Sequence, residues 1–175
     1  VVHDATPLML TEPSCKVDAL EEIVAELGSQ QAIVFAESRQ LIELAAARLA
    51  KVGVRVAQVT GTVPAHERAQ NVEDFKSGNT KVLLMTLGAG GEGLSFPGCT
   101  TAIFLQRSFS LVKNAQAEDR IHGLGRGQEG VASVIIDVIT TDSAEERVHS
   151  SGAYKAEMAE QVTRDQETLK TWLAK

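Results

Sequence analysis

Apolar residues follow two alternating patterns along this chain. Short continuous runs, such as Ala32-Ile33-Val34-Phe35, are typical of strands that are buried on both faces. Between the runs, apolar residues recur every three or four positions, which predicts amphipathic helices. The expected strands lie at 32–35, 54–59, 81–85, 101–105 and 131–139. The expected helices lie at 14–28, 38–53, 62–78 and 110–123, and further helices begin at Ser143.

Polar residues that can cap helices stand at the starts of the helical patterns. Ser14, Ser38 and Thr62 are the expected N-caps, and Pro64 suits the first turn of the third helix. Strands that alternate with helices at this spacing predict a parallel sheet with helices on both faces. Ligands of such sheets bind at the carboxyl ends of the strands, so function should reside in the loops that follow them.

The pattern also divides the chain into three parts. Residues 1–13 read as an extended lead-in, 14–142 as the α/β unit and 143–175 as a C-terminal helical extension. The chain begins without Met, so we expect it to be a piece of something longer.

Composition narrows the functional classes. The 175 residues include 17 Lys and Arg against 23 Asp and Glu, a net charge of −6, which excludes a protein that coats nucleic acid. The acids gather near the two ends, however, and the segment 31–139 is close to neutral. Cys15 and Cys99 lack neighbouring ligands for zinc, so we expect no metal site and two free thiols in a reducing compartment.

The glycine-rich segment Gly88–Gly93 satisfies G-x-G-x-x-G, the fingerprint of dinucleotide binding. That fingerprint requires a helix after the last glycine, and Pro97 breaks any such helix after one turn. The next strand ends in Gln106-Arg107 and lacks the expected ribose-binding acid. The hypothesis of an oxidoreductase that uses a nicotinamide or a flavin therefore rests on this loop alone.

Gln116 and Arg120 are four residues apart, so on a helix they lie on one face. A guanidinium beside a carboxamide suits a phosphate or a carboxylate, although most such pairs are simply solvated. His66-Glu67-Arg68-Ala69-Gln70 lacks the second His of a zinc-protease motif, and no G-x-x-x-x-G-K-[ST] loop occurs to hold a triphosphate.

Six segments, taken in order, carry a resemblance to a known family. They lie at 14–20, 32–36, 60–75, 86–96, 116–122 and 144–148. The sequence resembles the second, C-terminal RecA-like lobe of superfamily 2 helicases, nearest the Swi/Snf-type ATP-dependent DNA translocases. The last three segments are similar to motif V, to motif VI (Gln116-Ala117-x-Asp119-Arg120-x-His122) and to the brace helix of that family.

The resemblance implies a nucleotide-facing set of residues. Arg120 would be the arginine finger and Gln116 a contact to the γ-phosphate. Gly91, Glu92 and Gly93 would face the same nucleotide.

It also implies a set that grips nucleic acid. Ser38, Arg39, Thr60, Gly61 and Thr86 stand where the family contacts the backbone of the strand it tracks.

Two positions depart from the family pattern. Gly123 stands in place of the second arginine of motif VI, and Arg126, three residues further on, could substitute for it. Motif V contains one extra residue, because Leu87-Gly88 stands where the family has one residue.

The resemblance therefore implies one lobe of a DNA-dependent ATPase that is inactive alone. ATP and Mg²⁺ would be held mainly by an N-terminal RecA-like lobe, and the partners would be that lobe and the DNA backbone, with no membrane. We expect a monomer in the cytoplasm of a bacterium or a phage-infected host cell. The alternative is a helicase-like lobe used as a non-catalytic binding or scaffold module.

Overall fold

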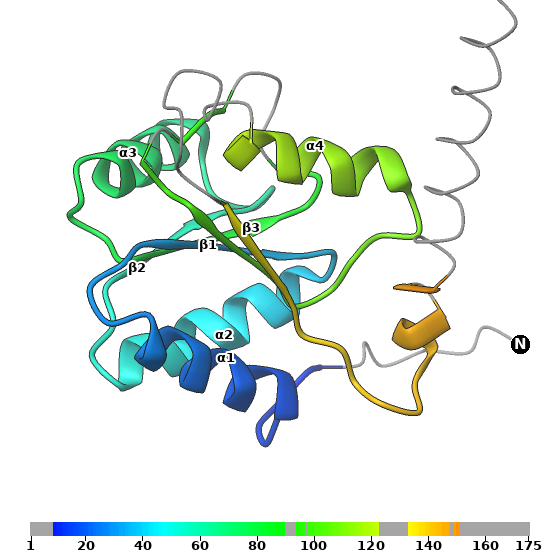
Figure 1. The fold of residues 1–175 in the computed structure, drawn as a ribbon. Coiled ribbons are helices and arrows are strands. Elements are labelled where there is room, and N and C mark those ends of the chain that lie inside the picture. Colours follow the sequence, from blue (N-terminus) through cyan, green and yellow to red (C-terminus); the bar gives the residue numbers. More distant parts are fainter. Residues whose placement is uncertain (1–8, 90–93, 97, 123–132, 148, 151–175) are drawn as a thin grey trace, which may run out of the picture.

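The computed structural model describes residues 9–89, 94–96, 98–122, 133–147 and 149–150. Nine helices and strands are defined within these ranges (Figure 1). In chain order they are α1 (Cys15–Glu26), β1 (Ala32–Ala36), α2 (Arg39–Lys51), β2 (Val56–Val59), α3 (Ala65–Lys76), β3 (Val82–Thr86), β4 (Thr101–Phe104), α4 (Leu111–His122) and β5 (Val134–Asp137). Residues 144–147 and 149–150 are helical, and the rest of the expected C-terminal extension lies outside the described residues.

The five strands form one sheet in the order β2-β3-β1-β4-β5. Every pairing is parallel, and β1 lies at the centre between β3 and β4. Helices α1 and α2 cover one face and α3 and α4 cover the other (Figure 1). The predicted fold class, a parallel sheet with helices on both faces, is confirmed.

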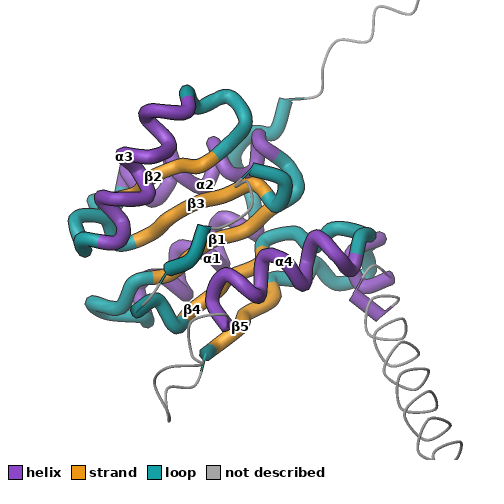
Figure 2. Tube along the Cα trace, turned by 90° about the horizontal axis from the view of Figure 1, so that it is seen from above, coloured by secondary structure: helices purple, strands orange, loops and turns teal. Residues whose placement is uncertain are grey.

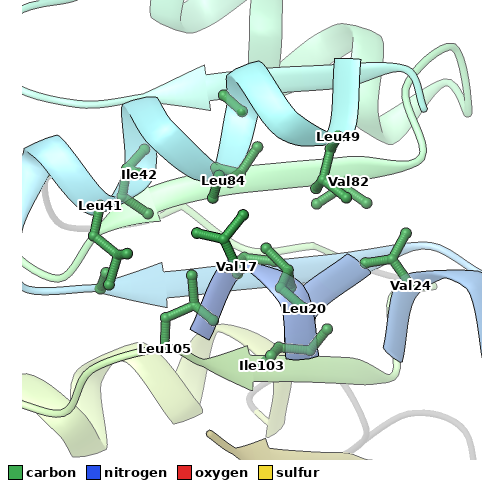
Figure 3. Close-up of a cluster of buried hydrophobic side chains, with 14 of the residues drawn as sticks. Val17, Leu20, Val24, Leu41, Ile42, Leu49, Val82, Leu84, Ile103 and Leu105 are labelled. Atoms are coloured by element: carbon green, nitrogen blue, oxygen red, sulfur yellow. The ribbon is translucent and has the colours of Figure 1, made fainter. Parts of the chain in front are cut away.

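Large apolar side chains hold the α1–α2 face together (Figure 3). Val17, Leu20 and Val24 of α1 recur at helical spacing and are almost completely buried. They pack with residues of α2 and with Val34 and Leu84 of the central strands. This face is a continuous hydrocarbon layer, which explains why α1 and α2 are so clearly marked in the sequence.

Aromatic rings dominate the opposite face. Phe35 of β1 and Phe104 of β4 stack with their centroids 5.1 Å apart. Phe75 of α3 meets Phe96 edge to face at 5.7 Å. Both faces of β1 are therefore packed, as its continuous apolar run predicts.

The element boundaries differ from the expected ones at a few positions. Thr62 does not cap α3, because its hydroxyl lies 3.0 Å from that of Thr60, and the helix instead follows Pro64. Ser14 precedes α1 without a side-chain cap hydrogen bond. β2 begins at Val56 rather than at residue 54, and β5 spans Val134–Asp137. Residues 131–132 lie outside the described ranges, and the three-part division of the chain stays a prediction.

Among the described residues, no helix combines the length and the apolar character needed to span a membrane. Within the same ranges, no group of three or more His, Cys, Asp or Glu side chains could hold a metal ion. Both cysteines are free thiols; Cys15 is exposed and Cys99 is buried.

Candidate functional site

The carboxyl ends of β2, β3 and β1 bring distant parts of the chain to one edge of the sheet. The register pairs Ala36 with Thr86 and Val59 with Met85. Thr60 follows directly after β2 and Ser38 lies two residues after β1, so both lie on the same edge as Thr86. Viewed from above, the three strands run side by side (Figure 2). We call this the carboxyl edge.

Ser38 is fixed by two hydrogen bonds of different kinds. Its hydroxyl accepts from the backbone N–H of Leu41 at 3.4 Å and caps α2. Its own N–H donates to Oε1 of Gln106, at the end of β4, at 3.0 Å. Because a hydroxyl both donates and accepts, the Ser38 hydroxyl can also donate a hydrogen bond. Sequence reasoning noted Gln106 only as the end of a strand.

The loop after β2 is held from beneath by α3. Arg68 donates to the carbonyl oxygens of Thr60, at 3.4 Å, and Val63, at 3.0 Å. The Thr60 side chain is only 1% exposed, whereas Gly61 is exposed. This loop therefore presents the Gly61 backbone to solvent, while Thr60 holds the loop in place.

The remaining grip residues lie at the ends of β1 and β3. Arg39 opens α2, is exposed and pairs with Glu43 one turn later, with 3.5 Å between Nε and Oε1. Thr86 ends β3 and is half-buried. On the same edge, Lys113 of α4 pairs with Glu37 at 3.0 Å, which adds an exposed cation that sequence reasoning missed.

Helix α4 carries the described part of the expected nucleotide-facing set. Because α4 joins the parallel strands β4 and β5, it runs back from the carboxyl edge, and Arg120 lies near its far end. Gln116 is exposed and Arg120 is half-buried. Burial lowers the pKa of the Arg120 guanidinium, since desolvation disfavours its charge. The described residues do not include Gly91, Glu92, Gly93, Gly123 or Arg126.

Arg107 is the most heavily engaged polar side chain near α4, and sequence reasoning assigned it no role. Its Nε lies 2.5 Å from Oδ1 of Asp137 and its Nη2 lies 3.0 Å from Oδ2, a bidentate pair. Its Nη1 contacts Glu118 of α4 at 2.5 Å, and its guanidinium lies 4.2 Å from the Phe104 ring centroid. Burial opposes the charge, but the hydrogen bonds to Asp137 and Glu118 outweigh it and raise the pKa of Arg107.

A second half-buried cation lies at the same end of the sheet. The ammonium of Lys16 donates to the carbonyl oxygens of Leu105 and Val138, which follow β4 and β5. It also pairs with Glu145 at 2.7 Å, and this links α1 to the helical residues that follow Ser143. The arrangement ties the C-terminal residues that the structure describes to the carboxyl edge.

These observations define two groups of residues. One lines the strand ends and offers hydroxyls, backbone N–H groups and exposed cations. The other lies on α4 and offers a half-buried guanidinium. A model of the helicase conserved C-terminal domain matches residues 15–126. The chain belongs to this helicase family.

Relatives of this helicase domain place it in the Swi/Snf branch of superfamily 2. Transcription termination factor 2 of Drosophila melanogaster is 28% identical over 159 residues, which is 87% of this chain and 15% of that protein. The human DNA excision repair protein ERCC-6-like is 28% identical over 167 residues, or 93% of this chain and 13% of that protein. The chain therefore spans a small part of the length of these relatives.

Solved structures share the RecA-like fold. The C-terminal part of the Fun30 ATPase domain matches with a TM-score of 0.69 and 21% identity, covering 81% of this chain and 47% of that one. Yeast Dbp5, solved with RNA and ADP BeF3 bound, matches with a TM-score of 0.63 and 22% identity, covering 78% of this chain and 35% of that one.

The expected source and location are wrong. We expected a cytoplasmic protein of a bacterium or phage, but many of the relatives that this helicase domain matches are eukaryotic. They include proteins of a fly, a fungus, human and a plant, with names that refer to transcription termination, DNA repair or chromatin remodelling.

Proposed function

We propose that this chain is the second lobe of an ATP-dependent DNA translocase. In this role the carboxyl edge grips the DNA backbone, and α4 offers Arg120 to an ATP molecule that an N-terminal lobe holds together with Mg²⁺. One observation carries the proposal. The strand-end residues lie on the edge of the sheet where α4 begins, and Arg120 lies about 14 Å further along that helix. A single lobe can thus face two ligands at once.

The chemistry of the carboxyl edge suits a phosphate backbone. The Ser38 hydroxyl, the Thr86 side chain and the exposed Gly61 backbone are small polar groups at loop ends. Groups of this kind position a duplex without reading its bases. The exposed cations Arg39 and Lys113 add a modest attraction, since each already has a carboxylate partner.

The environment of Arg120 suits a developing negative charge. A half-buried guanidinium whose pKa is lowered by desolvation gains strongly when an anion approaches it. ATP supplies the phosphoryl group that is transferred to water, and an arginine at the transition state accelerates that transfer about 10³–10⁵-fold. Gln116 would hold the γ-phosphate beside it, with Gly91, Glu92, Gly93 and Arg126 completing the contact.

The names of the relatives suggest the setting of the whole protein. Several refer to DNA repair, transcription termination or chromatin remodelling, so we propose a eukaryotic nuclear protein that moves on DNA. The lobe alone would be inactive, because Mg²⁺ and most of the ATP contacts would come from the other lobe.

The test is Arg120→Ala in the full-length protein. Hydrolysis of ATP with saturating duplex DNA should fall at least about 10³-fold, while the affinity for DNA stays unchanged. Arg48→Ala is the matched control, because Arg48 lies on α2 and pairs with Glu12, Asp18 and Glu21 away from both groups.

Each other result has a definite meaning. Turnover within a few-fold of wild type would remove Arg120 from the finger role. Stimulation of ATP hydrolysis by RNA and not by DNA would show that the protein acts on RNA instead. A wild-type protein that binds DNA without hydrolysing ATP would establish the non-catalytic scaffold, and turnover by the isolated 175-residue chain would show that a second lobe is not needed.

A further inference from the structure

Helix α4 is held to the sheet by small apolar contacts. Its buried residues are Asn114, Ala117 and Ile121, whereas α1 buries two valines and a leucine, and α2 buries five apolar residues. Apolar packing energy scales with buried area, so α4 is the less firmly packed helix. Its rotation about its own axis therefore depends on polar contacts.

Arg107 supplies the polar contact of this kind in the second half of α4, whereas Lys113 pairs with Glu37 and Asn114 bonds to Ser108 in the first half. It binds Glu118 of α4 with one side of its guanidinium and Asp137 of β5 with the other, and its Cζ lies over the ring of Phe104 of β4. The guanidinium fork is planar and rigid, so two carboxylates bound to it are fixed relative to each other. One side chain thus joins α4 to the ends of two strands.

The position of Glu118 on α4 decides what this contact controls. Residues of a helix advance by about 100° each, so Glu118 and Gln116 lie about 160° apart on opposite flanks of the buried stripe. Arg120 lies on the Gln116 flank. Fixing Glu118 on one side therefore sets the height and rotation at which Arg120 stands on the other.

The residue before Arg107 reaches into the carboxyl edge. Gln106 accepts the hydrogen bond from the Ser38 N–H at 3.0 Å, and Ser38 belongs to the group that we assign to the DNA grip. Two adjacent residues at the end of β4 therefore hold the two functional groups of the lobe. A single peptide bond joins the partner of Ser38 to Arg107.

We propose that Arg107 is a positioning residue that couples occupation of the carboxyl edge to the placement of Arg120 on α4. The coupling rests on the function proposed above. It runs from Ser38 through Gln106 to Arg107, and from Arg107 through Glu118 to α4. Coupling between distant sites is carried by contiguous hydrogen-bond and salt-bridge networks of this kind.

Amide hydrogen exchange of the full-length protein, with and without a DNA duplex, tests the transmission directly. In wild type, the duplex should slow exchange in the loops at 37–39 and 60–61 and also in α4. In Arg107→Met the loops should still be protected, while α4 no longer responds. Arg48→Met is the control, because it also removes an arginine that bridges carboxylates (Glu12, Asp18 and Glu21), but on the opposite face of the sheet. It should behave as wild type.

Steady-state kinetics separate positioning from mere stability. Arg107→Met should lower the DNA-stimulated kcat about tenfold and leave the KM for DNA unchanged. Arg107→Lys keeps the charge without the fork and should restore only part of the rate. Glu118→Gln preserves the shape of the side chain and the Arg107–Asp137 pair, so it tests the same link should Arg107→Met fail to fold.

The outcomes distinguish this inference from the proposed function. If DNA protects the loops but not α4 of wild type, the grip stands and the coupling is wrong. If α4 still responds in both Arg107→Met and Glu118→Gln, Arg107 is not the link. If DNA protects neither region, the DNA grip itself fails and the coupling fails with it.

Discussion

The two edges of the sheet make different demands on glycine. At the opposite end of the strands, where they begin and which we call the amino edge, Gly53 and Gly78 lie in the turns that lead into β2 and β3, with φ of +83° and +79°. Only glycine adopts such angles without strain. At the carboxyl edge, the φ of Gly61 lies outside this left-handed range, and apart from its two chain neighbours no described residue has an atom within 4 Å of the place where a Cβ would stand. The fold requires the first two glycines and does not require the third.

This difference separates residues that the chain needs for itself from those that serve a ligand. An exposed backbone without a side chain allows close approach of another molecule, and this is the use that the proposed DNA grip assigns to Gly61. The predictions below probe the contrast between the edges, beginning with the largest effect.

The reactivities of the two cysteines measure how accessible the two edges of the sheet are to a reagent in solvent. Cys15 is exposed beside Lys16, whose ammonium reaches the carboxyl ends of β4 and β5, whereas Cys99 is buried just before β4. Burial raises the pKa of the Cys99 thiol, so less of the reactive thiolate forms. A thiol reagent should label Cys15 at least about 100-fold faster, since Cys99 must wait for a local opening that costs about 3 kcal/mol. Mass spectrometry of the native chain measures both rates, and Cys15→Ser isolates the slow one. Equal rates would mean that the amino edge opens freely.

Gly61→Ala tests whether the carboxyl edge is kept clear for DNA. The free energy of unfolding should stay within about 0.5 kcal/mol of wild type, because the added methyl group meets open space. The affinity of the full-length protein for duplex DNA should fall about tenfold, since the methyl group keeps a phosphate from the backbone. Fluorescence anisotropy measures the affinity. An unchanged affinity would remove Gly61 from the grip.

Gly78→Ala is the counterpart at the amino edge. It should lower the free energy of unfolding by about 1 kcal/mol, because alanine is strained at this φ. Urea titration of the chain measures the loss, and the affinity for DNA should not change. A free energy of unfolding equal to that of wild type would show that the turn relaxes to another conformation. The proposed contrast between the two edges would then be wrong.

Local patterns in the sequence predicted most of the fold. The run Ala32–Phe35 marked the central strand, and the helical spacing of Val17, Leu20 and Val24 marked α1, because a buried face imposes its period directly on the sequence. The cap of α3 was predicted wrongly, since the hydroxyl of Thr62 turned to Thr60 instead of to the helix. The hydrogen-bond partner of a hydroxyl depends on the three-dimensional geometry of the loop, which the spacing of residues in the sequence does not determine.

The candidate site was predictable only in part. The resemblance to helicase motifs pointed to Ser38 and Arg120, and the fold and family that it implied are confirmed, while the roles of those residues stay predictions. Gln106 and Arg107 were missed because their partners are distant in sequence: Ser38 lies 68 residues away and Asp137 lies 30 residues away. No local pattern marks a side chain whose contacts form only after the sheet has assembled.

The central position of β1 has a consequence for the synthesis of the protein. β1 is made first among the strands, yet its two neighbours are β3 and β4, so its pairing is complete only when residue 104 has left the ribosome. Until then Ile33 and Phe35 belong to an unfinished strand edge, which is the kind of surface on which nascent chains aggregate. Truncated chains that end before β4 should therefore be insoluble. A chaperone that shields β1 would act after β1 has been synthesised and before β4 is complete.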